Sequence, residues 1–239
     1  MNVLAFDTCF GACSAAVLRR AGTQAPRLTC RFELRESGHA EALLPMIRAV
    51  MNESRTAFAD LDRIAVTVGP GTFTGTRTAI AAARGLALAA RVPAVGASSL
   101  AVMAAGAERR LGREELSGDL AVAVDVRRGE VYVQLFRRPG LAPRTAPLRL
   151  TYRAAAGLGG AGPLLLAGSG AEKVATEATA LGRRILVRLP ELQPDAADLA
   201  GMAPDLEPGS EPVRPLYLRE PDVTLPAPAP ADDQPMRNR

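Results

Sequence analysis

The same pattern occurs in VLAFDTCFGACSAAVLR (residues 3–19) and in AVAVDVRRGEVYVQLFR (residues 121–137). Each stretch consists of two short apolar runs, typical of paired strands, joined by a turn of the form Asp-xxx-Gly. The alignment pairs Asp7 with Asp125 and Gly11 with Gly129. Chance similarity between alanine-rich segments is the alternative, and the matching Asp and Gly positions argue against it. The pattern therefore predicts two related lobes that open with the same strand–turn–strand unit.

Strands and helices alternate after the first unit. The apolar runs predict strands at residues 3–8, 14–19, 29–34, 64–68 and 94–96, and helices at residues 39–53 and 76–90. Three consecutive strands with short turns indicate an antiparallel meander, whereas strands added after helices are expected to be parallel. We therefore expect an α/β fold with mixed sheets flanked by helices.

The duplicated pattern, together with a change in composition from Pro204 onward, suggests three regions. We predict a first lobe at residues 1–106, a second lobe at residues 107–220 and a proline-rich tail at residues 221–239. The tail has almost nothing to bury, so we expect it to be disordered. Within the region after Pro204, only VRPLYLRE (residues 213–220) has enough bulk to pack.

The overall composition indicates a globular, reduced protein. The chain has 239 residues, 48% of them hydrophobic, and a formal net charge of +4. No apolar run approaches the roughly 18 residues of a membrane-spanning helix, and the start MNVLAFDT lacks the form of a secretory leader. Three cysteines without metal-type spacing fit reduced thiols. These features predict a cytoplasmic protein with no membrane association.

The loop in VGPGTFTGTRTAIAAARGLA (residues 68–87) raises the question of nucleotide binding. A P-loop needs Gly-Lys-Ser/Thr, and the only lysine, Lys173, lies in SGAEKV, so that class is excluded. A helix N-terminus could still bind an anion. We favour a tight turn at Gly69 to Gly71 that launches the following helix, with hydroxyls from Thr72 to Thr76 available to cap it.

Two lobes that open with Asp-xxx-Gly resemble the actin-like ATPase (ASKHA) superfamily, whose lobes are RNase H-like. That resemblance implies phosphate contacts from these loops, which need small residues so that backbone N–H groups can approach the oxygens. Phe10 in the first loop and Arg127 and Arg128 in the second crowd those positions. We therefore expect no productive ATP hydrolysis by this chain alone. The candidate vestigial nucleotide-binding residues are Asp7, Gly11, Asp125, Gly168 and Gly170.

His39, in SGHAEALLPMI, is the only histidine. One imidazole without companion ligands does not make a zinc or iron site, so we predict no metal site. Pairing of His39 with Cys9, Cys13 or a serine as a nucleophilic pair stays open, since spacing cannot test it. The simpler interpretation places His39 in the first turn of its helix, capped by Ser37 or Gly38.

Two helices carry more apolar surface than one sheet covers. In the first helix, Ala40, Leu43, Leu44, Ile47, Val50 and Met51 follow helical spacing, with Pro45 among them. In the second, Arg77, Arg84 and Arg91 form one narrow charged stripe, and Ala, Leu and Ile fill most other positions. A helix that is apolar almost all round is buried on more than one side. We favour a helical interface with another polypeptide, with burial inside this chain as the alternative.

Four segments, SGHAEALLPMI, VGPGTFTGTR, VDVRRGEVYVQLF and RPLYLREPD, together resemble the bacterial TsaB (YeaZ) family. The resemblance runs in order from Asp7 to about Asp222. It implies an actin-like fold and a role in forming N6-threonylcarbamoyladenosine beside the anticodon of tRNAs that read codons starting with A. The family is understood as a non-catalytic partner of its paralogue TsaD, which transfers the threonylcarbamoyl group, together with TsaE and TsaC.

The resemblance also implies where partners bind. TsaD-like paralogues carry a metal-binding His-x-x-x-His after the corresponding helix, whereas VGASSLAVMAAG (residues 95–106) has no histidine. We expect docking on TsaD, help in assembling TsaE, a homodimer when TsaD is absent, and contact with tRNA through the complex. The candidate docking residues are His39, Leu43, Leu44, Ile47, Gly71, Thr74, Gly75, Arg77, Ile80 and Arg84.

No cofactor is expected on the isolated chain, and ATP or ADP is the candidate ligand at the interface of the complex. The alternative from another class is an enzyme. It would be an actin-fold ATP-dependent phosphotransferase using Asp7 and Asp125, or a glycoprotease-like peptidase using His39.

Overall fold

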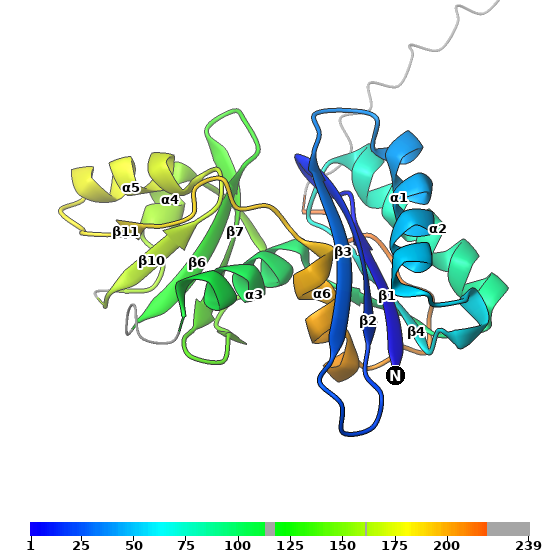
Figure 1. Cartoon of the computed structure of the whole chain (residues 1–239). Coiled ribbons are helices and arrows are strands. Elements are labelled where there is room, and N and C mark those ends of the chain that lie inside the picture. Colours follow the sequence, from blue (N-terminus) through cyan, green and yellow to red (C-terminus); the bar gives the residue numbers. More distant parts are fainter. Residues whose placement is uncertain (113–117, 161, 219–239) are drawn as a thin grey trace, which may run out of the picture.

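The chain forms two lobes that lie side by side, each built on one β-sheet (Figure 1). The computed structural model describes residues 1–112, 118–160 and 162–218. The predicted tail at residues 221–239 lies outside the described residues. Within them, no helix is long and apolar enough to cross a membrane.

The first lobe contains a five-stranded sheet in the order β3-β2-β1-β4-β5. The strands are β1 (Asn2–Asp7), β2 (Ala12–Arg19), β3 (Arg27–Leu34), β4 (Arg63–Thr67) and β5 (Ala94–Ala97). β1, β2 and β3 pair antiparallel, while β4 joins β1 and β5 joins β4 in parallel. This is the predicted meander with parallel additions, and each strand lies within two residues of its predicted position.

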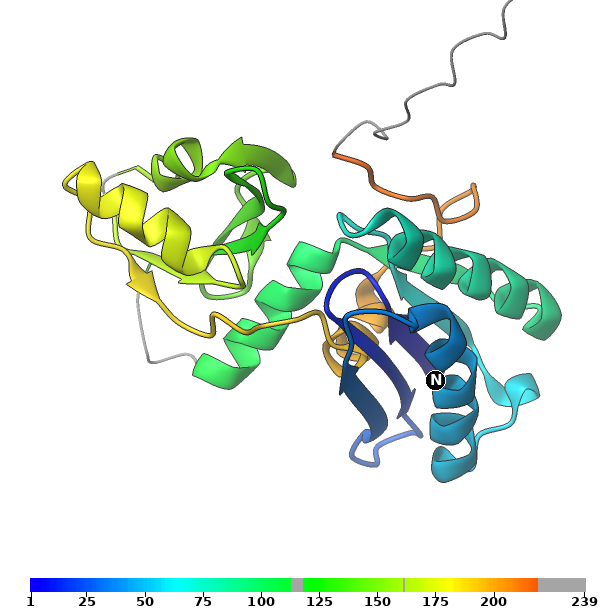
Figure 2. The same ribbon diagram turned by 90° about the horizontal axis from the view of Figure 1, so that it is seen from above.

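Helices cover both faces of this sheet. Helices α1 (His39–Ser54) and α2 (Phe73–Ala90) lie on one face and α6 (Ala196–Met202) on the other (Figure 2). Side chains alternate across a strand, so neighbouring residues of β1 enter different cores. Leu4 and Phe6 pack with α1 and α2, whereas Val3 and Ala5 pack with α6. Burial on both faces explains why β1 is a continuous apolar run.

Contacts and backbone conformations near their first residues define where the two long helices begin. α2 starts at Phe73, three residues before its predicted start, because the Thr72 side chain caps it by accepting a hydrogen bond from the Gly75 N–H at 3.2 Å. α1 is capped by Gly38 in a left-handed conformation, without a side-chain hydrogen bond. It continues through the exposed Pro45 as one helix.

The second lobe repeats the pattern of the first. Its six-stranded sheet has the order β11-β10-β6-β7-β8, with β9 also pairing with β7. The strands are β6 (Asp119–Asp125), β7 (Glu130–Arg137), β8 (Ala142–Pro143), β9 (Leu148–Thr151), β10 (Leu164–Ala167) and β11 (Leu186–Val187). Helices α4 (Tyr152–Ala156) and α5 (Ala171–Ala180) cover one face, and α3 (Ser99–Leu111) covers the other. Two 3-10 turns, Phe58–Asp60 and Ala203–Asp205, complete the described elements.

The duplication is visible in the pairing of the strands. β6 pairs antiparallel with β7 and parallel with β10, just as β1 pairs antiparallel with β2 and parallel with β4. Asp7 and Asp125 each end the first strand of their hairpin. The predicted α/β class, with two duplicated lobes of mixed sheets flanked by helices, is confirmed.

The domain boundaries differ from the predicted ones. The predicted boundary at residue 106 falls inside α3, which packs on the second sheet. Residues 196–216, predicted to belong to the second lobe, return to the first, where Leu199 is fully buried against the first sheet. The first sheet has two apolar faces, and α1 and α2 cover only one of them, so α6 is needed on the other.

Candidate functional site

The glycine-rich loop before α2 packs against the first Asp-xxx-Gly turn. A Cβ atom on Gly75 would lie 2.0 Å from the Thr8 carbonyl oxygen, and one on Gly71 would lie 2.6 Å from the Cys9 carbonyl oxygen. The Thr72 N–H donates to that Cys9 oxygen at 2.8 Å, and Thr8 Oγ1 donates to the Gly75 oxygen at 2.7 Å. Glycine is required here because backbone meets backbone. This geometry agrees with a turn that launches the helix.

Asp7, at the end of β1 beside this loop, is fully buried. Its Oδ1 accepts hydrogen bonds from Thr67 Oγ1 and from the Cys9 N–H, while Oδ2 has no hydrogen-bond partner. Burial raises the pKa of Asp7 to about 7, because removal from water penalises the charged carboxylate. The carboxyl therefore does not face the space between the lobes.

Asp125 is the counterpart of Asp7 in the second lobe, and neighbouring groups bind its carboxylate. It forms an ion pair with Lys173, and it accepts hydrogen bonds from Tyr152 Oη at 2.9 Å and from the Arg127 N–H at 2.9 Å. Burial alone would raise the pKa of Asp125, but the hydrogen bonds from Lys173, Arg127 and Tyr152 outweigh it and lower the pKa. Sequence reasoning missed Lys173 and Tyr152, since nothing in the pattern links them to Asp125.

The other candidate nucleotide-binding glycines have structural roles in this conformation. A Cβ on Gly168 would lie 2.5 Å from the Ala123 carbonyl oxygen, and one on Gly170 would lie 2.5 Å from Val131 Cγ1. Both glycines therefore allow the loop after β10 to approach β6 and β7. Gly11 is exposed, and its N–H donates to Gln193 Oε1 at 3.1 Å.

A cleft of about 1300 Å³ separates the two Asp-xxx-Gly turns. The first lobe lines it with Phe10, Gly11 and residues 35–41 and 71–75, and the second lobe with residues 124–127, Tyr132 and Ser169. Gln193 and residues 216–218 complete the wall. This cleft is lined by six of the residues predicted from the sequence: Gly11, His39, Gly71, Thr74, Gly75 and Asp125. Asp7 is buried and does not line it.

His39 contributes a structural contact to this wall. Its Nε2 lies 2.9 Å from the Phe10 carbonyl oxygen, which ties the first turn of α1 to the Asp7 turn. Burial raises the pKa of the Cys9 and Cys13 thiols, so both are poor nucleophiles. The hydrogen bond of His39 to a backbone oxygen agrees with the structural interpretation. Among the described residues, no three His, Cys, Asp or Glu side chains gather as metal ligands.

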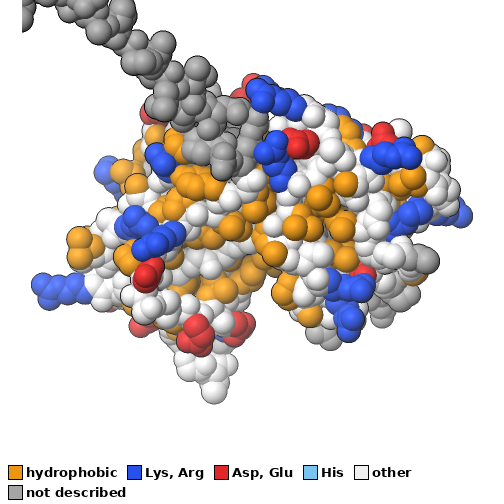
Figure 3. All heavy atoms as spheres, turned by 180° about the vertical axis from the view of Figure 1, so that it is seen from behind, with side chains coloured by type: hydrophobic (Ala, Val, Ile, Leu, Met, Phe, Trp, Pro, Cys, Tyr) orange, Lys and Arg blue, Asp and Glu red, His pale blue; other side chains and the backbone are white. Residues whose placement is uncertain are grey.

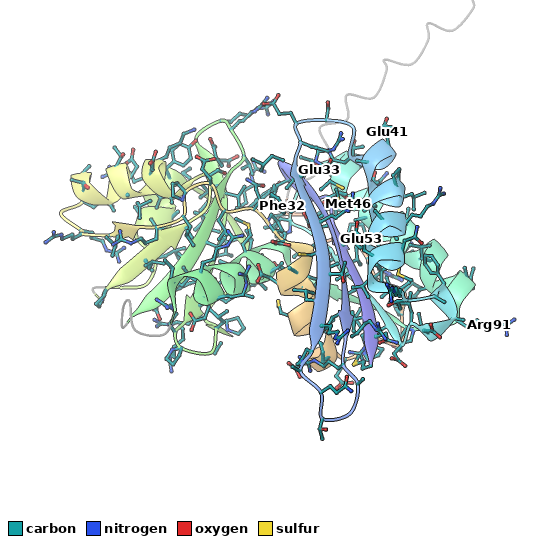
Figure 4. The ribbon with its side chains drawn as sticks, viewed as in Figure 1. Phe32, Glu33, Glu41, Met46, Glu53 and Arg91 are labelled. Atoms are coloured by element: carbon teal, nitrogen blue, oxygen red, sulfur yellow. The ribbon has the colours of Figure 1, made fainter. Side chains whose placement is uncertain are left out.

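The structure corrects four of the predicted docking residues, of which Gly75 is buried against the Thr8 turn. Leu43, Ile47 and Ile80 are 1%, 2% and 3% exposed and pack inside the first lobe. Met46 also lies between α1 and the sheet (Figure 4). These side chains are already covered by the lobe itself, so they cannot contact a second polypeptide in this conformation. Helical periodicity identified the apolar side of each helix but not the neighbour that covers it.

Other apolar residues of the same helices are exposed. Leu44 on α1 is 55% exposed, and Phe73 and Leu88 on α2 are 46% and 82% exposed. Ala81 and Gly85 are exposed on the same side of α2. We call Leu44, Phe73, Ala81, Gly85 and Leu88 the exposed helix face. Seen from behind, the first lobe shows hydrophobic patches among Arg side chains (Figure 3).

The arginine stripe of α2 is partly occupied by the C-terminal segment of the described chain. Arg84 donates to the Val213 carbonyl oxygen, with Nε at 2.9 Å, and Arg77 Nε donates to Tyr217 Oη at 2.8 Å. The Phe73 and Tyr217 rings stack with centroids 5.8 Å apart. Arg91, at the end of α2, extends away from the lobe (Figure 4). Residues 213–217 of the segment with bulk in the proline-rich region therefore pack along α2.

Comparisons with known proteins match this chain to proteins of tRNA threonylcarbamoyladenosine formation. Residues 33–143 match the family model described as TsaD, tRNA N6-adenosine threonylcarbamoyltransferase. A curated protein of Escherichia coli K12, the tRNA threonylcarbamoyladenosine biosynthesis protein TsaB, is 40% identical over 138 residues, which is 58% of this chain and 56% of that protein. The chain spans about half the length of the curated TsaB relatives it matches.

Two further matches cover nearly the whole chain. An uncharacterized protein of Mycobacterium tuberculosis H37Rv is 31% identical over 224 residues, which is 93% of each chain. The solved structure of YeaZ from Pseudomonas aeruginosa has a TM-score of 0.76 and 30% identity, and the match covers 91% of this chain and 99% of that one.

Proposed function

We propose that this chain, which belongs to the TsaB (YeaZ) family, is the non-catalytic partner subunit of a TsaD-type threonylcarbamoyltransferase. In this role it acts in the cytoplasm, in forming N6-threonylcarbamoyladenosine next to the anticodon of tRNAs that read codons starting with A. It docks on TsaD, contributes to the assembly with TsaE, and reaches tRNA through the complex. When TsaD is absent, the same face pairs two copies of the chain.

The observation that carries this proposal is the exposed helix face. Ala81, Gly85 and Leu88 follow the spacing of one side of α2, and Phe73 lies across the stripe of Arg77 and Arg84 from them. Leu44 is also exposed, on α1, which lies on the same face of the sheet as α2 (Figure 2). Apolar surface of this kind on a globular lobe typically marks a protein interface. Ala81 and Gly85 favour a helical partner, because small side chains let two helices approach closely.

The charged and aromatic residues beside this face suit the rim of an interface. Arg77 lies 3.9 Å from the centre of the Phe73 ring and hydrogen-bonds to Tyr217. Aromatic residues and arginines are the residue types that most often dominate binding energy. The fixed positions of Phe73, Arg77 and Tyr217 limit the entropy lost when a partner binds.

The surroundings of Asp7 and Asp125 support a non-catalytic role. Asp7 is fully buried, and Asp125 is paired with Lys173. Neither carboxylate is free to act in the cleft as an actin-fold phosphotransferase would need. His39 contacts a backbone oxygen, so the glycoprotease-like alternative has no base–nucleophile pair to support it. ATP or ADP, if required, would bind where the cleft meets the partner.

Reconstitution of tRNA modification tests the proposal. TsaC, TsaD, TsaE and this chain are combined with unmodified tRNA, threonine, bicarbonate and ATP, and the modified nucleoside is measured by mass spectrometry. We expect strong formation with all four proteins and a loss to near background when this chain is omitted. Full modification without this chain would contradict the proposal. ATP turnover or tRNA modification by the isolated chain would do so as well.

A further inference from the structure

A cluster of four polar side chains lies buried beneath the start of α2. The carboxyl of Asp7, the thiol of Cys9 and the hydroxyls of Thr67 and Thr76 are all 0% or 1% exposed. Cys9 Sγ lies 3.3 Å from Thr67 Oγ1 and 3.8 Å from Thr76 Oγ1. We call these four residues the Asp7 cluster. Neither the proposed docking role nor the cleft uses them.

The cluster lacks a group that could balance a negative charge on Asp7. One carboxyl oxygen holds two hydrogen bonds and the other, Oδ2, holds none. The titratable groups that face Asp7 are the Cys9 thiol from the adjoining turn, the Cys13 thiol from β2 and the carboxyl of Asp195, the N-cap of α6. The hydroxyl of Thr67 faces it from β4. All three titratable neighbours are acids, so none supplies positive charge.

Asp7 is connected to the start of α2 through Cys9. The Cys9 N–H donates to Asp7 Oδ1 at 3.2 Å, and the Cys9 carbonyl oxygen accepts from the Thr72 N–H at 2.8 Å. Thr72 is the N-cap of α2, and Thr76 in the first turn contacts the Cys9 sulfur. Movement of the Asp7 turn therefore changes both the cap and the first turn of this helix.

We propose that Asp7 is a proton-operated latch on the start of α2. The neutral carboxyl lets the loop at residues 69–76 close over the Asp7 cluster. Loss of the proton leaves a buried charge with one unpartnered oxygen, which is costly unless water reaches it. We assign the opening to the 69–76 loop, because Gly71 and Gly75 pack directly on the Thr8–Cys9 backbone and the Cys9 N–H of that backbone binds the Asp7 carboxyl.

The Asp7 carboxyl gains or loses its proton near neutral pH. Burial raises the pKa of Asp7 to about 7, so the carboxyl changes its charge near neutrality. Because α2 carries the exposed helix face, opening of the latch would also change the affinity of this face for a partner. That consequence rests on the proposed function, whereas the latch itself is a property of the isolated chain.

Amide hydrogen exchange on the isolated chain tests the latch. Protection factors of the Thr72 and Thr76 amides are measured at pH 6 and pH 8 and corrected for the intrinsic pH dependence of exchange. In the wild type we expect protection to fall by about tenfold between these values, the ratio set by ionisation one unit above the pKa. Asp7→Asn mimics the neutral acid and should show no such fall. The α5 amides of the second lobe, for example that of Val174, serve as the internal control.

A carboxyl ¹³C titration provides an independent measurement in case Asp7→Asn fails to fold. Asp7 should titrate near pH 7, and Thr67→Val should raise that midpoint, because the Thr67 hydroxyl stabilises the carboxylate. An ordinary midpoint near pH 4 would overturn the proposal. So would an unchanged midpoint in Thr67→Val, or equal pH responses of wild type and Asp7→Asn. These outcomes do not depend on any partner, so they are separate from failure of the proposed function.

Discussion

Replacing Gly75 with alanine should destabilise the chain, although alanine is the better helix former. The new Cβ would lie 2.0 Å from the Thr8 carbonyl oxygen, whereas ordinary contact begins at 3.4 Å, so α2 or the Thr8 turn must move by more than 1 Å. Overpacking of this kind typically costs about 1–3 kcal/mol. The movement also strains the hydrogen bond from Thr8 Oγ1 to the Gly75 oxygen, worth about 1 kcal/mol. The higher helix propensity of alanine offsets roughly 1 kcal/mol of this cost. We therefore expect the free energy of unfolding to fall by about 1–3 kcal/mol.

Gly85→Ala is the matched control, because it makes the same change on the same helix. Gly85 is exposed, and no atom lies within 4 Å of its Cβ position. At this position the substitution changes only the helix propensity, so the free energy of unfolding should rise by about 0.5–1 kcal/mol. Urea unfolding followed by circular dichroism measures both variants, with equal m-values as the check on two-state behaviour. If Gly75→Ala were as stable as Gly85→Ala, the inferred contact between the loop and the Thr8 turn would be wrong.

Three further outcomes follow from single contacts. Thr72→Ala removes the side-chain cap of α2 and should cost about 1 kcal/mol in urea unfolding; no change would mean that the cap is not formed in solution. Lys173→Met removes the ion pair of Asp125, so the pKa of Asp125 measured by NMR should rise while stability stays nearly constant. An unmoved pKa would refute that pairing. Asp7 binds a proton in the folded chain between about pH 4 and pH 7, where the unfolded chain has lost it. Its contribution to the free energy of unfolding should therefore fall by about 1.4 kcal/mol per pH unit as the pH rises through this window. The slope should be missing from Asp7→Asn, and equal slopes in both proteins would contradict the burial of this carboxyl.

Local patterns in the sequence were enough to predict the elements of the first lobe. Apolar runs and turn residues are properties of neighbouring positions, so they located β1 to β5 and α1 closely. The shared Asp-xxx-Gly pattern also revealed the duplication, because related hairpins keep the same turn. The start of α2 was placed too late, since the capping role of Thr72 was not distinguished from that of the other hydroxyls in the loop.

Contacts between distant parts of the chain could not be predicted in the same way. Periodicity grouped Leu43, Leu44 and Ile47 on one helix side, but only the packed lobe shows that Leu44 is exposed and the other two are buried. The return of α6 to the first sheet and the pairing of Lys173 with Asp125 depend on chain segments far apart in sequence. Nothing local in the sequence encodes either contact.

Binding of the chain to TsaD tests the central claim most directly. Leu88 is 82% exposed, so Leu88→Asp should fold normally, while a charge buried without a partner in the complex costs several kcal/mol. Isothermal titration calorimetry should show a loss of affinity of about 100-fold or more, equivalent to roughly 2.7 kcal/mol. Leu181→Asp, at an exposed apolar residue of the second lobe, is the control and should bind as the wild type does. Wild-type affinity in Leu88→Asp, with an unchanged melting temperature, would contradict docking through the exposed helix face.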